Sequence, residues 1–199
     1  AISMALSRAE ICKTVGDDYE ASTQFIAKYM LSNLGTGKKF SDESGEMVTE
    51  DIAKAKSLLA EAGYPNGAGF PTVTYNYPNN EQDKLIAQAI QAQLKSALNI
   101  NVELNGMESQ VCVSERKSGN FDMTRHNWTA DYDDAMDYLL MWTSTSGLND
   151  AGIKDADYDK LCEDATAELD EAKRNTIMHD AEKLLVTDKA YVAPLATNK

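Results

Sequence analysis

The sequence contains few of the residues that mark metal sites, nucleic-acid binders or membrane spans. Three cysteines occur in 199 residues, none in a C-x-x-C spacing, and the two histidines have no cysteine pair near them, so no zinc pattern is present. No stretch approaches the roughly 18 uninterrupted apolar residues of a membrane-spanning helix. Basic residues number 19 against 32 acidic ones, which gives a net charge of −13. This excess and the lack of a basic cluster argue against nucleic acid as a partner, because such binding depends on neutralising phosphates.

The cysteines predict free thiols, and the acidic residues are concentrated in the second half of the chain. An odd number of cysteines cannot close completely into disulfides, so we expect Cys12, Cys112 and Cys162 to be buried free thiols. The net charge is −3 over residues 1–100 and −10 over residues 101–199. An acidic second half is compatible with a solvated surface, a cation site or a site for positively charged groups.

Both ends of the chain resemble the edges of a domain cut from a longer protein. Ser7 and Glu10 have the S-x-x-E spacing of a capping box, which predicts a helix from Ser7 to about Val15 that ends at Gly16. The apolar residues before Ser7 are expected to be the tail of an element that begins upstream. Residues 191–195 are expected to form a strand close to the other end.

The first half of the sequence predicts a loosely organised segment followed by a helix. Residues 16–48 are rich in Gly, Ser, Asp and Lys and are expected to be a long, partly ordered connection. Thr49 is the expected N-cap of the next helix, with Glu50 and Asp51 in its first turn, where negative charge suits the helix dipole. An apolar stripe runs through this helix from Ile52 to Ala62, and the following glycine ends it.

Strands and helices alternate in the centre of the chain. The predicted order is strand 72–77, helix 81–98, strand 100–104, helix 108–117 and strand 121–128. Such alternation favours a mainly parallel sheet with right-handed crossovers. Two further amphipathic helices follow, the second capped by Asp170. The fold class is therefore α/β, with a mixed, mainly parallel sheet flanked by helices.

The side chains best suited to bind a ligand follow the third predicted strand. Ligands of open α/β sheets favour the carboxyl ends of strands, and Arg125, His126, Asn127, Trp128 and Asp131 lie at or just past such an end. A Trp beside an Asp and an Arg can offer an apolar wall, an anion for an ammonium group and a fork for a carboxylate. The structural alternative is a core Trp with an ordinary Arg–Asp ion pair.

The sequence matches the motifs of more specific ligand sites and catalytic sites less well. A calcium loop that starts at Asp155 fails, because Lys160 stands where the loop needs Gly and Thr166 where it needs Glu. Those aspartates are better explained as helix caps. Paired-carboxylate catalysis remains open within Asp131–Asp137. The sequence has no G-x-S-x-G elbow, P-loop or G-x-G-x-x-G motif, so no cofactor is assigned.

The segment from Gly119 to Leu140, with Trp128-Thr-Ala-Asp-Tyr132 at its centre, resembles the ligand-contacting segment of the oligopeptide- and dipeptide-binding proteins of ABC importers, the extracellular solute-binding proteins of family 5. Residues 143–150, the two later helices and Ala193-Pro-Leu195 resemble the family's next loop, C-terminal helices and returning strand. The resemblance implies a periplasmic-binding-protein-like fold of type II. It implies that residues 1–199 are a single C-terminal lobe, with the N-terminal lobe of the same protein outside this chain.

The resemblance also implies roles for individual residues. Asp131 matches the residue that pairs with the α-ammonium of a peptide, and Asn127, Trp128 and Thr129 match the segment that pairs with the peptide backbone. Arg125 matches a position that can meet a ligand carboxylate. His126 and Asn127 replace small residues common in the family, and Ala135 replaces a usual Pro, so the site and its loop are expected to differ in shape.

Three functions therefore compete. The first is peptide capture by an extracytoplasmic receptor, either a lipid-anchored lipoprotein or periplasmic, which delivers peptides to ABC-transporter permease subunits without catalysis. Within the family, nickel chelates or other small solutes are alternative ligands. The second is a hydrolase that uses the acidic cluster Asp131–Asp137. The third is an interaction module whose acidic second half binds a basic partner, with strongly salt-dependent affinity.

Overall fold

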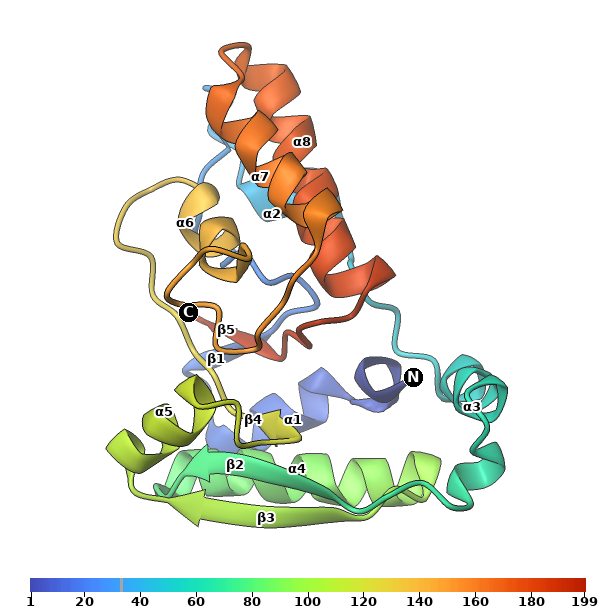
Figure 1. Cartoon of the computed structure of the whole chain (residues 1–199). Coiled ribbons are helices and arrows are strands. Elements are labelled where there is room, and N and C mark those ends of the chain that lie inside the picture. Colours follow the sequence, from blue (N-terminus) through green and yellow to red (C-terminus); the bar gives the residue numbers. More distant parts are fainter. Residues whose placement is uncertain (33) are drawn as a thin grey trace. The chain divides into compact units, whose positions relative to one another are not determined.

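The computed structural model describes residues 1–32 and 34–199 (Figure 1). The chain folds into two compact units, here called unit 1 and unit 2. Unit 1 consists of residues 1–21, 49–126 and 198–199, and unit 2 consists of residues 22–48 and 127–197. The chain passes from one unit to the other after Ala21, Val48, His126 and Thr197.

Unit 1 is built on a three-stranded parallel sheet. β2 (Val73–Pro78) is the central strand, paired on one side with β3 (Val102–Met107) and on the other with β4 (Met123–Thr124). The helices that connect these strands are α4 (Glu81–Leu98) and α5 (Ser109–Lys117). The predicted α/β class with a mainly parallel sheet is thus confirmed, and the predicted bounds of α4 are correct.

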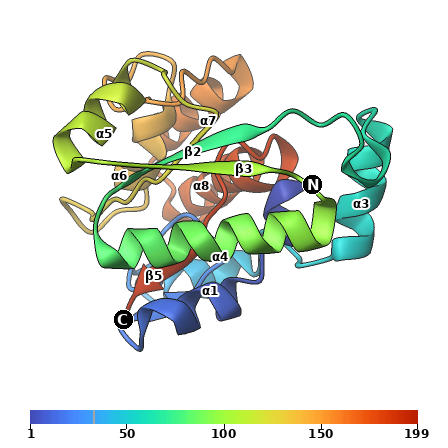
Figure 2. The same ribbon diagram turned by 90° about the horizontal axis from the view of Figure 1, so that it is seen from below.

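Helix α4 supplies much of the core of unit 1. Its buried residues follow a helical spacing: Ile86, Ala87, Ile90, Leu94 and Leu98. The helix contacts β2 and β3 on one side and α1 (Arg8–Val15) on the other, an arrangement visible in Figure 2. It also contacts α3 (Ile52–Glu61) and the short helix η1 (Ile2–Ala5). The remaining elements of unit 1 are β1 (Tyr19–Ala21) and η2 (Pro65–Gly67).

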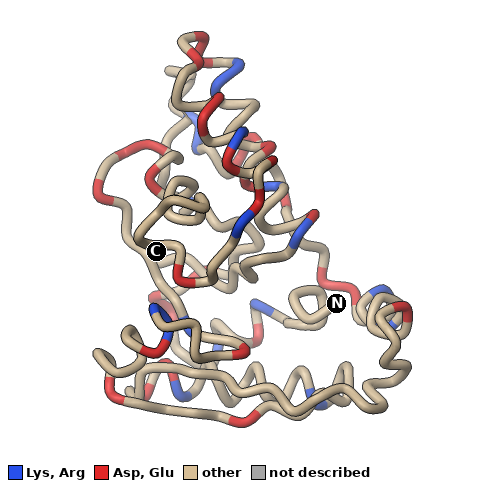
Figure 3. The backbone as a smooth tube through the Cα atoms, in the orientation of Figure 1, with Lys and Arg blue, Asp and Glu red and all other residues tan. Residues whose placement is uncertain are grey.

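Unit 2 is largely helical. α7 (Ala156–Ala167) and α8 (Glu171–Lys183) lie side by side and both contact α6 (Met136–Leu139) (Figure 1). The unit also contains α2 (Phe40–Ser44), η3 (Leu140–Trp142) and η4 (Leu184–Asp188), a π-helical turn that follows α8. The last strand is β5 (Ala196–Asn198), whose first two residues belong to this unit. Both helices carry charged residues (Figure 3): those of α7 are mostly acidic, whereas those of α8 are of both signs.

The helix caps were predicted with mixed success. Asp170 caps α8 as predicted, and Asp155 caps α7 by accepting hydrogen bonds from the amides of Asp157 and Tyr158. The capping box at Ser7 is wrong. Ser7 is the N-cap of α1 without a side-chain cap bond, because the Ser7 amide donates to Gln93 and the Arg8 amide to Glu50. Tertiary partners therefore replace the local box.

The second helix also begins later than predicted. Asp51 rather than Thr49 caps α3, and its carboxylate accepts from the amide of Lys54. The apolar stripe of α3 is narrower than expected, since Ala55 and Leu59 are buried whereas Ile52 is 51% exposed. The apolar side of α7 ends with the helix, since Leu169 lies beyond its last residue and is 95% exposed.

Two further expectations about the backbone are wrong. The strand predicted over residues 121–128 pairs only at Met123–Thr124, with one further amide bond from Arg125 to Asn76, because the chain then leaves unit 1. Residues 191–195 form no strand. The amide of Tyr191 donates instead to the carbonyl of Leu185, the second residue of η4, and Pro194 has no amide hydrogen to donate.

The segment 16–48 is more ordered than predicted. It contains β1 and α2, and Ile26, Met30 and Phe40 are almost completely buried. Asn33, within this predicted connection, lies outside the described residues.

The cysteines agree with prediction, since Cys12, Cys112 and Cys162 are buried free thiols. Burial raises the pKa of the Cys162 thiol to about 12, which makes it unreactive at neutral pH.

A buried carboxylate organises part of unit 2. Glu182 on α8 is fully buried, and its Oε1 accepts hydrogen bonds from the amides of Phe25 and Ile26 at 2.8 and 2.9 Å. Within the described part of the chain, its Oε2 is buried without a partner. Burial raises the pKa of Glu182 to about 7, because the charged form loses its hydration.

The buried position of Leu94 predicts a large cost for truncation. Leu94→Ala should lower the free energy of unfolding by about 2–5 kcal/mol, because it removes packed methyl groups and leaves a cavity. Gln88→Ala, on the exposed face of the same helix, should change it by less than about 0.5 kcal/mol. Denaturant unfolding measures both values, and equal values would contradict the assigned face.

The raised pKa of Glu182 predicts a pH dependence of stability. The folded protein holds the proton more tightly than the unfolded chain, so this contribution is complete below about pH 4.5 and is lost as the pH rises through about 7. The loss amounts to about 3 kcal/mol. Glu182→Gln should abolish it, while Glu163→Gln on the exposed face of α7 should retain it. Unfolding free energies measured from pH 5 to 8 test this, and parallel curves for all three proteins would contradict it.

Candidate functional site

The six predicted site residues fall on both sides of the chain's passage after His126. Arg125 and His126 belong to unit 1, whereas Asn127, Trp128, Thr129 and Asp131 belong to unit 2. Asn127, Thr129 and Asp131 are exposed, and Arg125, His126 and Trp128 are half-buried. The structure therefore brings four of the six residues together within unit 2, and the two in unit 1 have surroundings of their own.

Arg125 is held by groups of unit 1. Its Nε donates to Oδ1 of Asp83 on α4 at 3.1 Å, and its Nη1 donates to the carbonyl of His126. The Arg125 and Asp83 side chains are 20% and 16% exposed. The predicted Arg–Asp ion pair thus exists, but its acidic member is Asp83 rather than Asp131. A ligand carboxylate that used Arg125 would share the guanidinium with Asp83.

The residues of unit 2 form a loop that a second aspartate organises. Asp137, at the start of α6, is 9% exposed, and its Oδ2 accepts hydrogen bonds from Nε1 of Trp128 at 2.8 Å and from the amide of Asp131 at 3.1 Å. The sequence pointed to Asp137 only as one of several acids in the cluster. Its spacing of nine residues from Trp128 is no recognised motif, so its role as an acceptor could be found only from the structure.

The carboxylate of Asp131 takes no part in these internal bonds. Across residues 1–32 and 34–199, only its backbone amide has a hydrogen-bond partner, Asp137. The side chain is exposed and so can meet a cation from solvent. Its neighbour Tyr132 is 51% exposed, and the pKa of its phenol is raised by partial burial and by the carboxylates of Asp137 and Asp134. The loop is therefore a region of negative potential.

Three contacts attach the loop to the rest of unit 2, and the first is a 3.4 Å hydrogen bond from the amide of Leu31 to Oδ1 of Asp133. The amide of Ala130 donates to the hydroxyl of Tyr29 at 3.4 Å, and that hydroxyl shares a 2.7 Å hydrogen bond with the hydroxyl of Tyr138. Arg174 on α8 pairs with Asp134 at 2.9 Å. Asp134 also accepts from the amide of Met136, so the turn that the family resemblance predicted to differ in shape is closed by a side chain.

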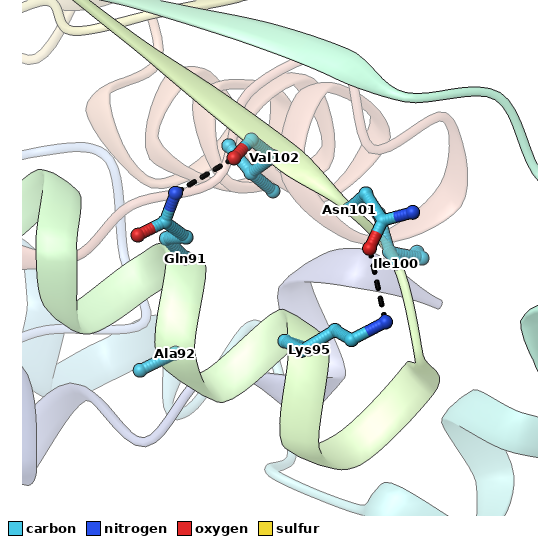
Figure 4. A pocket seen from close by; sticks show the side chains of 6 residues that line it. All are labelled: Gln91, Ala92, Lys95, Ile100, Asn101 and Val102. Atoms are coloured by element: carbon cyan, nitrogen blue, oxygen red, sulfur yellow. Dashed lines mark hydrogen bonds between the residues drawn. The ribbon is translucent and has the colours of Figure 1, made fainter.

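A shallow pocket in unit 1 lies elsewhere. It has a volume of about 330 Å³ and lies between α4 and the start of β3 (Figure 4). Its polar groups satisfy one another, since Gln91 donates to the carbonyl of Val102 and Lys95 donates to Asn101. None of the six predicted site residues lines it. We assign it no chemistry.

Neither metal clusters nor membrane-spanning helices occur among the described residues. Within residues 1–32 and 34–199, no three or more His, Cys, Asp or Glu side chains are grouped to hold a metal ion. Every helix described there is too short or too polar to span a lipid bilayer.

This fold is the one found in solved peptide-binding proteins, among them a periplasmic one. A solved peptide-binding protein of a peptide ABC transporter superposes on this chain with a TM-score of 0.88 and 25% sequence identity, covering all of this chain and 88% of the solved one. The predicted periplasmic-binding-protein-like fold is confirmed.

The family model of bacterial extracellular solute-binding proteins, family 5, matches residues 1–150, and this chain belongs to that family. It is 31% identical to the dipeptide-binding protein DppE of Bacillus subtilis over 194 residues, which are 96% of this chain and 35% of DppE. It is 34% identical to the periplasmic murein peptide-binding protein MppA of Escherichia coli over 152 residues, 75% of this chain and 28% of MppA. The chain thus spans about a third of the length of these curated relatives.

The sheltered ion pair of unit 1 should contribute measurably to stability. A double-mutant cycle with Asp83→Asn and Arg125→Met should give a coupling of about 1–2 kcal/mol, between the values typical of exposed and of buried pairs. The exposed pair Glu10–Lys13, with side chains 61% and 70% exposed, serves as control and should give less than about 0.5 kcal/mol. Unfolding free energies give both couplings, and equal couplings would show that Asp83 does not engage Arg125 in solution.

Proposed function

We propose that this chain is a ligand-binding part of the substrate-binding component of an ABC importer, and that the ligand is a peptide recognised by its amino end. The observation that carries the proposal is the exposed carboxylate of Asp131, held beside the half-buried ring of Trp128 on a loop fixed by Asp137. Membership of a solute-binding family and the likeness to DppE and MppA support this function.

The proposed recognition has two parts. Asp131 pairs with the α-ammonium of the peptide, an interaction that gains strength when the ligand and the carboxylate are withdrawn from water together. The backbone of residues 127–129, which forms no strand in this structure, adds the peptide as an extended segment. Main-chain hydrogen bonds do not depend on the ligand's side chains, so this mode accepts peptides of many sequences.

The remaining parts of the proposal concern the whole protein. Residues 1–199 make up one ligand-binding lobe, the C-terminal one, and an N-terminal lobe of the same protein completes the site. Closure of the two lobes withdraws the ligand from water. The protein acts outside the cytoplasmic membrane, free or attached by a lipid, and delivers its ligand to permease subunits. It catalyses no reaction, in keeping with a family of solute-binding proteins.

Exchange of the Asp131 carboxylate for an amide tests the proposal. In the intact protein, Asp131→Asn should weaken binding of tri-alanine by about tenfold or more, because the ammonium loses its charged partner. Binding of N-acetyl-tri-alanine should change little, since that peptide has no ammonium. Isothermal titration calorimetry measures both affinities.

Asp133→Asn provides the matched control, because Asp133 is an exposed aspartate of the same loop. It removes the same charge from the loop and should leave the preference for the free amino group intact. Equal losses for the two peptides in the Asp131→Asn variant would remove Asp131 from this role.

A further inference from the structure

Asp137 differs from the other acidic residues of the cluster Asp131–Asp137 in its burial and in the hydrogen bonds that it accepts. It follows the first residue of α6, between Met136 and Tyr138, both of which are almost completely buried. A single oxygen, Oδ2, accepts both the indole N–H of Trp128 and the amide N–H of Asp131. One buried acceptor thus connects the ring and the backbone of the two residues proposed to meet the ligand.

Helix α6, which carries Asp137, is packed firmly within unit 2. Met136, Tyr138 and Leu139 are buried in unit 2, and α6 contacts both α7 and α8. Asp134, three residues before Asp137, is fixed by Arg174 of α8. The loop, in contrast, is attached elsewhere by two longer hydrogen bonds of 3.4 Å, from the amide of Ala130 to Tyr29 and from the amide of Leu31 to Asp133. Asp137 is therefore the main link between a rigid support and an exposed loop.

We propose that Asp137 is a positioning residue for ligand binding. It does not touch the ligand, and it acts by fixing the backbone of Asp131 and the ring plane of Trp128, so that the exposed carboxylate and the indole face the same amine-bearing ligand. This inference rests on the proposed function. It adds a specific claim, namely that the preference for a free amino group depends on the two hydrogen bonds accepted by Asp137.

The two bonds require an acceptor and not a negative charge. A side-chain amide oxygen has two lone pairs and can accept the same two N–H groups, so Asp137→Asn preserves the geometry with a neutral group. Asp137→Ala removes the acceptor and leaves both donors without a protein partner. Comparison of Asn with Ala therefore separates positioning from a contribution of the Asp137 charge to the field at the ammonium.

The experiment uses the intact protein with tri-alanine and N-acetyl-tri-alanine as probes. In Asp137→Ala, affinity for the free peptide should fall about tenfold, while in Asp137→Asn it should stay within about threefold of the wild-type value. When Asp131→Asn is added to Asp137→Ala, it should reduce affinity for tri-alanine much less than it does in the wild-type protein, because a misplaced carboxylate contributes little to binding. Near-ultraviolet circular dichroism should show the Trp128 signal, identified by Trp128→Phe, changed in the Ala variant and retained in the Asn variant.

The outcomes separate the two proposals. If Asp131→Asn alone leaves the preference for the free amino group unchanged, the proposed function is wrong. If Asp131→Asn abolishes that preference but Asp137→Ala does not reduce it, the proposed function stands and the positioning role is overturned. Additive losses in the double variant would overturn it as well. Should Asp137→Ala fail to fold, the Asn variant decides, since a loss equal to that of Asp131→Asn would mean that charge rather than position matters.

Discussion

In the loop that carries the candidate site, one acceptor, the Oδ2 atom of Asp137, binds both of the residues proposed to meet the ligand. A loop without strand or helix must satisfy its polar groups individually, and here the indole of Trp128 and the amide of Asp131 are satisfied by the same buried oxygen. The consequence is a division of labour between two aspartates. Asp137 is buried and occupied by internal bonds, while Asp131 is exposed and available to a ligand.

Carboxylates act as hydrogen-bond acceptors for irregular segments of unit 2. Glu182 accepts from Phe25 and Ile26 and so attaches the segment 22–48 to α8. Glu43 accepts from Ser32 and from Asn175 of the same helix. Segments with little regular structure thus depend on side chains that are distant in sequence. This dependence explains why residues 16–48 looked like a loose connection in the sequence, although Ile26, Met30 and Phe40 belong to the core.

The sheet of unit 1 and the loop of unit 2 differ in how far they could be predicted. The strand–helix alternation predicted the parallel sheet and the extent of α4, because apolar periodicity is a local signal. The third strand was predicted too long, since its composition suits a strand and nothing local shows that the chain leaves unit 1 after His126. The capping box at Ser7 failed for a similar reason, because Gln93 and Glu50 supply the acceptors.

The sequence by itself determined the α/β class, the capped helices, the buried thiols and the family, because these depend on periodicity, composition and the pattern around Trp128. Only the tertiary structure decided which charged groups pair. Arg125 pairs with Asp83 rather than with Asp131, and Asp137 rather than any of its acidic neighbours accepts from Trp128. Acidic residues in one segment are chemically equivalent until folding places some against donors and leaves others in water, and that placement depends on contacts between residues far apart in the chain.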